Sequence, residues 1–371
     1  MVSQSNTIVR CSNCLNASTR PRIEFDSRGW CNACQWMEEK KTIDWRAREE
    51  VLLKILDKHR GRGQFDCLVT VSGGKDGSYV AHTLKNRYGI NPLCLTVRPP
   101  MPLEIGDHNL NNFIDSGFEH LHVSVHKEAM RKLDRIGFID YGQGYYGWLI
   151  AIHTAVLRTA KNFGIGLIFY SEDGEIEYGG STKNKNIATY GTEYMKKAYL
   201  NDTYQNIINS ASLSHDERYW FEFPFEKNSD QIDVAHFSFF EAWDPYRNYL
   251  IAKEFCGLKE LDEGVVGTFT NFAQNDQELA SLHYYLMYLK FGFGRATQDA
   301  GIEIRRGAMT RDQAINLVRI YDNQPPIASF PRYADYYKIS LDEFNSVIDK
   351  HVNKNLFEKI NGVWEPNFDV E

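Results

Sequence analysis

The stretch that decides the fold is Val71-Ser72-Gly73-Gly74-Lys75-Asp76-Gly77-Ser78. An apolar segment, Cys67-Leu68-Val69-Thr70, precedes it, and residues 79–84 follow it with a helical pattern. A glycine-rich turn between a strand and a helix N-terminus lets backbone N–H groups and the helix dipole face an anion. Lys75 adds a positive charge, and Ser72 and Ser78 add hydroxyl donors. We therefore predict that residues 72–78 form a phosphate-binding loop.

The spacing of this loop differs from the G-x-x-x-x-G-K-[ST] loop of common NTPases. It resembles the Ser-Gly-Gly-x-Asp-Ser loop of the PP-loop ATP pyrophosphatases, with Gly77 inserted between Asp76 and Ser78. Those enzymes hold the pyrophosphate of ATP and transfer AMP to a substrate oxygen. The resemblance implies an ATP site, and the alternative is a glycine turn that binds no ligand.

The composition is typical of a globular protein with a large core, since 43% of the 371 residues are hydrophobic and 25% are charged. A net charge of −7 counts against a nucleic acid as the main partner, because such proteins usually carry a basic surplus. Residues 1–6 are polar and predict no signal peptide, and no apolar run approaches the roughly 18–20 residues that span a bilayer. We expect a cytoplasmic protein with no membrane partner, whose seven cysteines are thiols or metal ligands.

Four cysteines form two Cys-x-x-Cys pairs, Cys11 with Cys14 and Cys31 with Cys34, separated by 16 residues. This spacing predicts a tetrahedral Zn²⁺ site, with an iron–sulfur cluster or a redox pair as alternatives. Four thiolates would leave zinc no open position, so its role would be structural, and the small module would depend on the metal for folding. Nearby arginines also permit a zinc ribbon that contacts nucleic acid or a partner.

Strand patterns that alternate with helical patterns predict a parallel α/β sheet covered on both faces. The expected strands are 66–71, 92–97, 119–125 and 166–170, and the expected helices are 36–60, 79–88, 108–116 and 145–163. Ligands of such sheets bind beyond the carboxyl ends of the strands. Thr96, Val97 and Arg98 would therefore lie near the adenine of ATP.

The alternation ends near residue 175. Residues 175–230 are polar and aromatic without a clear period and could include a substrate loop. Helical patterns then dominate, at 236–255, 277–291, 311–321 and 341–351. We predict a zinc-binding module at 1–40, a PP-loop ATP-binding α/β domain at 41–230 and a mainly helical region at 231–371.

Acidic residues follow the fourth expected strand, at Glu172, Asp173, Glu175 and Glu177. ATP chemistry uses Mg²⁺, which binds carboxylate and phosphate oxygens, so acids at the crevice could hold that ion or contact a substrate. The alternative is a solvated acidic turn. The residues that we expect to be catalytic are Lys75, Asp76, Glu172 and Glu175.

Arginines stand beside glycines in the C-terminal half, at Arg295, Arg305 and Arg306. Guanidinium groups suit a carboxylate or the diphosphate of a sugar nucleotide, so we expect these three arginines and Glu177 to bind substrate. Surface ion pairs with Glu303 and Asp312 are an equal alternative. Thr310 is expected to cap the helix that follows it.

Taken in order, these motifs resemble one family over nearly the whole chain. The cysteine pairs and the loop 71–78 are followed by residues 172–180, by Trp243-Asp244-Pro245-Tyr246-Arg247-Asn248 and by residues 290–311. Together they are similar to the N-acetyl sugar amidotransferases of surface-polysaccharide biosynthesis, the WbpG/PseA type. The resemblance implies that an acetamido group on a free or UDP-linked sugar becomes an acetamidino group for O-antigen, capsule or flagellin glycans. The implied cofactors are ATP, Mg²⁺ and Zn²⁺.

Such a reaction needs ammonia. Val2 stands where an N-terminal glutaminase nucleophile would be cysteine, and the chain has no Gly-x-Cys-x-Gly elbow. We therefore expect the nitrogen to come from a separate glutaminase, and the resemblance implies a cyclase-like channel subunit as well.

Two other functions stay open. A tRNA sulfurtransferase can also join zinc knuckles to a PP-loop, but such enzymes generally use reactive cysteines near the ATP crevice. Cys67 and Cys94 instead lie in expected strands, and the acidic balance disfavours tRNA. A zinc-ribbon adaptor would use the nucleotide fold only as a scaffold and would tolerate the loss of Lys75.

Overall fold

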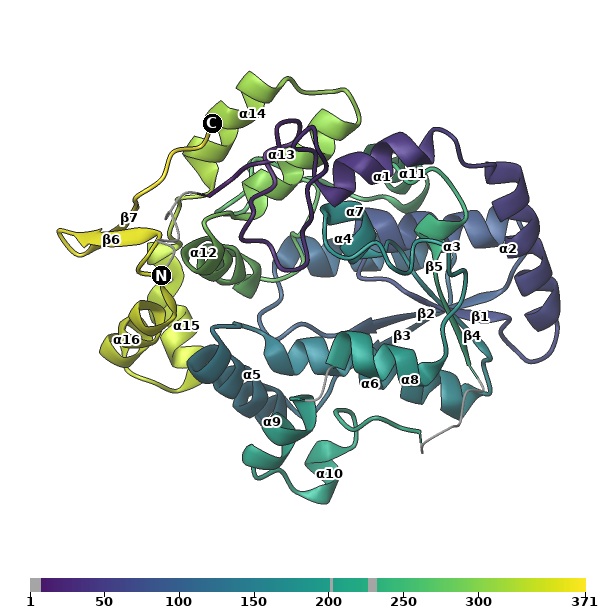
Figure 1. Ribbon diagram of the computed structural model, residues 1–371. Helices are drawn as coiled ribbons and strands as arrows, with labels where there is room; N and C mark the ends of the chain where they lie inside the picture. Colours follow the sequence, from purple (N-terminus) through teal and green to yellow (C-terminus); the bar gives the residue numbers. More distant parts are fainter. Residues whose placement is uncertain (1–7, 201–202, 226–231) are drawn as a thin grey trace.

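The computed structural model describes residues 8–200, 203–225 and 232–371, so the polar residues 1–6 lie outside the described part. A five-stranded parallel sheet has the strand order β3-β2-β1-β4-β5 and lies between two layers of helices (Figure 1). The predicted parallel α/β class is confirmed. Because β2 and β4 flank β1 on opposite sides, the sheet has a switch point beside β1, where open sheets bind ligands. The strands are β1 (Cys67–Thr70), β2 (Pro92–Val97), β3 (His120–Val123), β4 (Leu167–Tyr170) and β5 (Asp233–His236).

Successive residues of β1, β2, β4 and β5 pack into two different cores. Leu68 belongs to the core that includes the helices α5 and α6, and Val69 belongs to the core on the other face. Both faces are therefore apolar, as a sheet with helices on each side requires. The first face is covered by α5 (Lys127–Tyr141) and α6 (Tyr146–Phe163), and the second by α2 (Trp45–His59), α3 (Lys75–Asn86), α4 (Glu104–Asp115) and α11 (Pro245–Cys256).

The single helix expected at 36–60 is wrong, because the chain breaks it into α1 (Asn32–Lys40) and α2. Asp44 caps α2 by accepting hydrogen bonds from the backbone nitrogens of Arg46 and Ala47. The indole of Trp45 donates to the carbonyl oxygen of Lys40 at 3.2 Å, which closes the bend. An aspartate at the N-cap favours the start of a new helix, and the single helix expected at 36–60 did not take Asp44 into account.

The region after β3 is more helical than expected. The helix α5 was not predicted, and the described residues of 175–225, where the sequence shows no clear period, carry short helices. Met195, Leu200 and Ile207 from this region are buried in the same core as α6, so the region covers part of the sheet. The short helices are α7 (Gly174–Tyr178), α8 (Thr192–Met195), a π-helical turn (Lys196–Leu200), α9 (Tyr204–Ser210) and α10 (His215–Arg218).

The helix expected at 236–255 is wrong in its first half. β5 and a 3₁₀ turn, Phe237–Phe239, occupy the start, and α11 begins only at Pro245. Asp244 caps α11 through its side chain, and proline fits the first helical position because it needs no N–H acceptor. The predicted domain boundary at 230–231 falls outside the described residues and stays a prediction.

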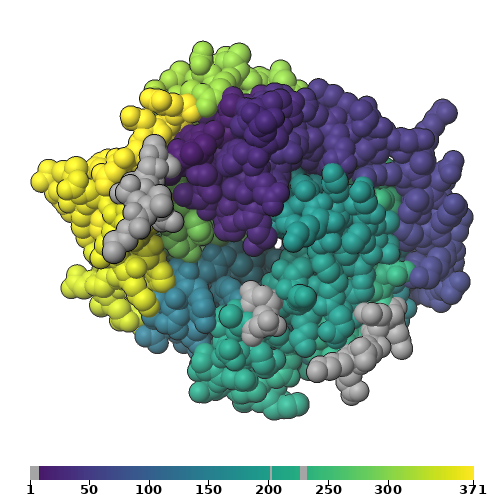
Figure 2. Space-filling view, viewed as in Figure 1, coloured from purple at the N-terminus to yellow at the C-terminus, as the bar shows by residue number. Residues whose placement is uncertain are grey.

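The C-terminal part is mainly helical and ends in a hairpin. The helices expected at 277–291, 311–321 and 341–351 are confirmed, and Thr310 caps its helix together with Gln313. The start of the described chain packs here, since Ile8 and Ala17 share a core with the last helices (Figures 1 and 2). None of the described helices has the length and apolar character needed to cross a bilayer. The elements are α12 (Leu279–Phe291), α13 (Arg295–Arg305), α14 (Arg311–Tyr321), a 3₁₀ turn (Ile327–Ser329), α15 (Phe330–Tyr337), α16 (Leu341–His351), β6 (Phe357–Ile360) and β7 (Val363–Pro366).

Candidate functional site

The loop after β1 and the first turn of α3 each require glycine at one position. Gly73 has a φ of +79°, and a Cβ atom there would meet the backbone nitrogen of Leu110 at 2.4 Å. A Cβ atom on Gly77 would lie 2.6 Å from the carbonyl oxygen of Thr70. Gly74 is the N-cap of α3 and offers no side-chain cap. Among the described residues, no side chain therefore caps the first N–H groups of α3, as an anion site at a helix N-terminus requires.

A cavity of about 260 Å³, here called the crevice, lies beyond the carboxyl ends of β1, β2 and β4. One wall is apolar and consists of Trp148, Ile152 and Val156, which follow one another at single-turn spacing on α6. Such a wall suits the flat face of a nucleotide base. The predicted residues that line the crevice are Ser72, Gly74, Lys75, Asp76, Gly77, Thr96, Val97 and Glu172.

Asp76 is held from two directions. It forms an ion pair with Lys75, in which both side chains are largely buried. Asn248 of α11 is fully buried and donates from Nδ2 to Oδ1 of Asp76 at 2.9 Å. Arg247 in turn donates to Oδ1 of Asn248 at 3.0 Å, which fixes the orientation of the amide. The carboxylate of Asp76 is therefore preorganised before any ligand binds.

Glu172 follows β4 and lines the crevice with Asp76. Burial and the negative charge of Asp76 raise the pKa of Glu172 to about 7, while Lys75 acts in the opposite direction. Tyr178 donates its hydroxyl to Oε1 of Glu172 at 2.8 Å. Two carboxylates that repel each other beside a phosphate loop fit Mg²⁺, because a bound cation would relieve the repulsion.

Five residues predicted to bind the nucleotide or substrate differ in how they relate to the crevice: Thr96 lines it, and the other four do not. Thr96 donates its hydroxyl to the carbonyl oxygen of Val71 and so ties β2 to the end of β1. Arg98 is half-exposed, 3.9 Å from Asp107, and is not among the lining residues. Ser78 is fully buried, and Gly73 packs on α4, so neither lines the crevice. Arg295 forms a buried ion pair with Asp299 at 2.8 Å and lines a small cavity that includes Lys75.

The four predicted metal ligands come together in one buried cluster. The Sγ atoms of Cys11, Cys14, Cys31 and Cys34 all lie within 4.8 Å of one another. Cys11 and Cys34 are separated by 3.7 Å, close to the ~3.8 Å between sulfurs that tetrahedral Zn–S bonds of about 2.3 Å imply. The cluster therefore fits Zn²⁺ with no open coordination position.

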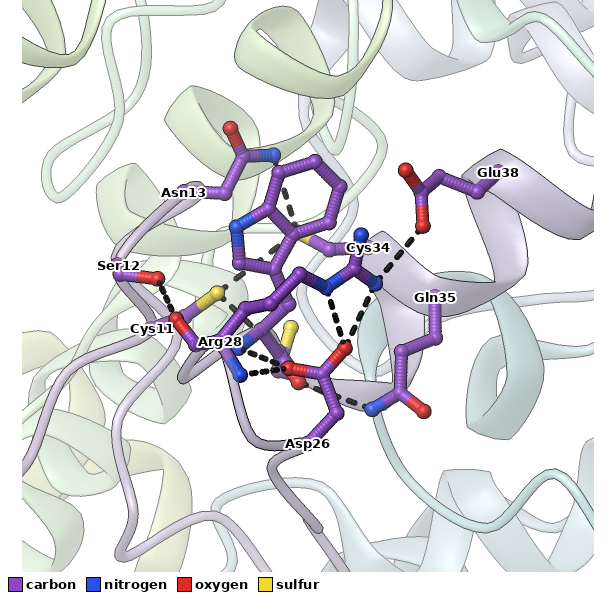
Figure 3. A network of polar contacts seen from close by, with 10 residues as sticks. Cys11, Ser12, Asn13, Asp26, Arg28, Cys34, Gln35 and Glu38 are labelled. Carbon is purple, nitrogen blue, oxygen red and sulfur yellow. Dashed lines mark hydrogen bonds and ion pairs between the residues drawn. The ribbon is translucent and has the colours of Figure 1, made fainter.

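Polar groups surround this cluster (Figure 3). Asn13 donates from Nδ2 to the sulfur of Cys34 at 3.3 Å. The backbone nitrogen of Cys31 donates to the sulfur of Cys11 at 3.2 Å. Arg28 pairs with Asp26 at 2.6 Å and with Glu38 at 2.8 Å, which links the second knuckle to α1. Donors around the sulfurs orient the ligands and favour their ionised form.

Arg305 lies against the cysteine cluster. Burial lowers its pKa, but the nearby thiolates of Cys14, Cys34 and Cys31 outweigh burial and raise it above the usual value. A zinc ion with four thiolates carries two net negative charges, and Arg305 offsets part of that charge. This partner explains the position of Arg305 outside the crevice.

Three more predicted site residues lie where the cysteine module meets the rest of the chain. Glu175 accepts hydrogen bonds from Arg22 at 2.5 and 2.8 Å, and Glu177 accepts from Lys40 and from the indole of Trp36, each at 2.8 Å. Glu175 and Glu177 are therefore not brought to the crevice with Glu172. Glu177, Arg305 and Arg306 instead line a second cavity of about 560 Å³ between the module, α11 and α13.

Three features that form or support the crevice were not predicted from the sequence. Asn248 stood in the quoted Trp-Asp-Pro-Tyr-Arg-Asn motif, but nothing local connected it with Asp76. Trp148 lay in an expected helix without a sign that it faced the crevice. Residues 272–276 also line the crevice, and the only signal there was a run of amide side chains outside the expected helices.

Comparisons with known proteins address the C-terminal part of the chain and one shorter stretch. Residues 266–368 match the family model described as the C-terminal domain of WbpG-like LPS biosynthesis proteins. An uncharacterized protein of Methanocaldococcus jannaschii is 28% identical over 90 residues, which make up 24% of this chain and 32% of that protein. The match thus spans about a third of the length of that relative. The C-terminal part of this chain is similar to WbpG-like proteins of LPS biosynthesis.

Proposed function

We propose that this chain is an ATP-dependent, AMP-forming amidotransferase of lipopolysaccharide biosynthesis. It adenylates the acetamido oxygen of an N-acetyl sugar, free or UDP-linked, and replaces that oxygen with ammonia. The observation that carries the proposal is the crevice, where the N-terminus of α3 lies with Lys75, Asp76 and Glu172. The similarity of residues 266–368 to WbpG-like proteins supports the choice of pathway.

The chemistry begins with an amide oxygen that leaves poorly. In the proposed reaction this oxygen attacks the α-phosphorus of ATP, the bond from that phosphorus to the bridging oxygen breaks, and pyrophosphate departs. Ammonia then adds to the activated carbon. The carbon–oxygen bond breaks, AMP departs with the former amide oxygen, and an amidinium group is left on the sugar.

The residues of the crevice match these needs. The N-terminus of α3 and Lys75 would bind the phosphates and offset the charge that grows on the departing pyrophosphate. Asp76 and Glu172 would hold Mg²⁺, which when bound neutralises phosphate charge. The wall that contains Trp148 would contact the adenine. The Zn²⁺ in the cysteine cluster would be structural.

The remaining cysteines favour this reaction over tRNA thiolation. Cys67, Cys94 and Cys256 are buried and do not line the crevice. Burial raises the pKa of the Cys67 thiol, and it raises that of Cys256 to about 11. A sulfur carrier needs an accessible thiolate, which these positions do not offer.

The nitrogen would come from a separate glutaminase, with a channel subunit between the two enzymes. The isolated chain should then use ammonium at high concentration and should use glutamine only when the partner is added. Rapid glutamine-dependent turnover by the pure chain would contradict this part of the proposal.

The decisive experiment uses isotope labelling. N-acetylhexosamines, free and UDP-linked, carry ¹⁸O in the acetamido carbonyl and are incubated with ATP, Mg²⁺ and ammonium chloride. Mass spectrometry should detect an amidino sugar and AMP that contains the heavy oxygen. Release of ADP, or AMP without the label, would refute the reaction.

Two lysines of α3 provide matched variants for this experiment. Lys75→Ala should abolish AMP formation, because the phosphates lose their only cation on this loop. Lys85→Ala removes a lysine near the other end of the helix, whose Nζ donates to the carbonyl oxygen of Gly117, and should leave turnover intact. An adaptor without catalysis would tolerate both changes.

A further inference from the structure

The wall of the crevice formed by residues 272–276 belongs to the C-terminal half of the chain. Phe272, Ala273, Gln274, Asn275 and Asp276 all line the crevice. Phe272 and Ala273 also line the small cavity that includes Lys75 and Arg295. The segment therefore extends to the end of the crevice where the phosphate loop lies, and it falls within the stretch similar to WbpG-like proteins.

This segment is fixed in place by contacts with the start of α4. The backbone nitrogen of Leu103 donates to the carbonyl oxygen of Asp276 at 3.1 Å, and that of Glu278 donates to Met101 at 2.9 Å. A Cβ atom on Gly106 would lie 2.6 Å from Cα of Asp276, so the two backbones touch. Gln274 has a φ of +56°, which is costly for a side chain of this size. Strained backbone held by its surroundings occurs often at binding sites.

Asn275 has a hydrogen-bonding group without a partner. Its side chain is buried, with 4% of the residue exposed, yet it borders the crevice. No described residue accepts a hydrogen bond from Nδ2 of Asn275. Buried amide groups in folded proteins are almost always paired, so an oxygen atom of a ligand is the natural acceptor.

The charges nearby indicate what kind of oxygen this is. Residues 272–276 include Asp276 and no cation, and Glu172 and Asp76 also face the crevice. Asp276 would repel phosphate oxygens, and Lys75 with the N-terminus of α3 attracts them. A neutral carbonyl oxygen can accept a hydrogen bond from an amide without being repelled by the carboxylates. An amide group also becomes positively charged when its oxygen is adenylated, and the adjacent carboxylates would stabilise that charge.

We propose that Asn275 binds the acetamido group of the sugar, with Nδ2 donating to the carbonyl oxygen that ATP adenylates. This assignment rests on the proposed function and names the residue that selects an N-acetyl sugar over the corresponding hydroxy sugar. The C-terminal half of the chain then supplies the acceptor subsite, and the α/β part supplies the nucleotide subsite.

The test measures sugar binding without turnover. The full zinc-loaded chain is saturated with Mg²⁺ and an ATP analogue whose α–β bridge is a methylene group, and N-acetylglucosamine and glucose are titrated with detection by NMR. The unchanged chain should prefer N-acetylglucosamine. Asn275→Ala and the isosteric Asn275→Asp should each lower that affinity about tenfold, the effect of one lost hydrogen bond. Asn275→Ala, which adds no charge, should leave nucleotide affinity unchanged.

Asn271→Ala is the matched control. Asn271 is four residues away, donates to the carbonyl oxygen of Leu261 at 2.8 Å and does not line the crevice, so its loss should leave the sugar preference intact. Equal sugar affinity in the Asn275 variants, an equal loss in Asn271→Ala, or no preference in the unchanged chain would overturn the assignment. If the proposed function itself were wrong, the unchanged chain would form no AMP from ATP with any N-acetyl sugar and ammonium. That result is measured separately from sugar binding.

Discussion

Asn248 and Asp76 are 172 positions apart in the sequence, yet Nδ2 of Asn248 lies 2.9 Å from Oδ1 of Asp76. The bond joins α11, which follows the fifth strand, to the first turn of α3. The phosphate loop is therefore completed by a residue that enters the fold much later in the chain.

Asn248→Ala should lower the rate of AMP formation about tenfold, because the carboxylate of Asp76 loses the donor that orients it. Enzyme assays with ATP, Mg²⁺ and ammonium measure the effect. The control is Asn162→Ala, which removes an exposed amide that donates to the hydroxyl of Tyr219. An Asn248→Ala enzyme that stays folded and keeps its full rate would show that Asp76 needs no such support.

Glu172 should make magnesium-nucleotide binding depend on pH near neutrality. Burial and Asp76 raise its pKa to about 7, so the carboxyl group is largely protonated below that pH and must lose its proton to bind a cation. Affinity for Mg²⁺ with ATP should therefore rise as the pH increases through about 7. Calorimetry in buffers of different ionisation enthalpy should detect the released proton.

The same shift affects stability in the opposite sense. A carboxyl group whose pKa rises from 4.5 to about 7 on folding binds more protons in the folded state than in the unfolded state. The free energy of unfolding therefore falls as the pH rises from about 4.5 to about 7. Glu172→Gln should remove this loss in ligand-free protein. Glu175→Gln is the control, because Arg22 outweighs burial and lowers the pKa of Glu175. A stability curve unchanged by Glu172→Gln would contradict the assignment.

Two glycines with the same φ of +79° separate conformational cost from crowding. Gly307→Ala should cost about 1 kcal/mol, because the new Cβ atom meets nothing within 4 Å and only the backbone is strained. Gly73→Ala should cost considerably more and abolish nucleotide binding, because its Cβ atom meets the backbone of Leu110. Thermal unfolding and ATP titration compare the two, and equal losses would show that crowding at Gly73 is unimportant.

Removal of the metal should weaken the nucleotide site as well as the cysteine module. Helix α7 accepts contacts from the module through Glu175 and Glu177, and its last residue, Tyr178, donates to Glu172 in the crevice. Cys34→Ser should therefore lose Zn²⁺, unfold at a lower temperature and bind ATP more weakly. Cys256→Ser, a buried cysteine outside the cluster, should keep the metal. Unchanged ATP affinity in the zinc-free protein would mean that the two sites are independent.

The features that depend on neighbouring residues were predictable from the sequence. The loop 71–78 identified the first strand, the turn and the helix, and the spacing of Cys11, Cys14, Cys31 and Cys34 predicted the cluster. Both signals arise because residues close in the chain must satisfy one local geometry. The helix break at Asp44 was equally local and could have been predicted from its capping side chain.

The tertiary structure alone decided which of the charged residues share a site. Glu172, Glu175 and Glu177 are nearly adjacent in the sequence, but the start of α7 turns their side chains toward different neighbours, so only Glu172 lines the crevice. Arg305 lies beside thiolates. Asn248 contacts Asp76, and Asn275 lines the crevice, although both stand far along the chain from the phosphate loop. These outcomes depend on how helices pack across the sheet, and that packing follows from burial of apolar faces summed over the whole molecule, not from any single stretch.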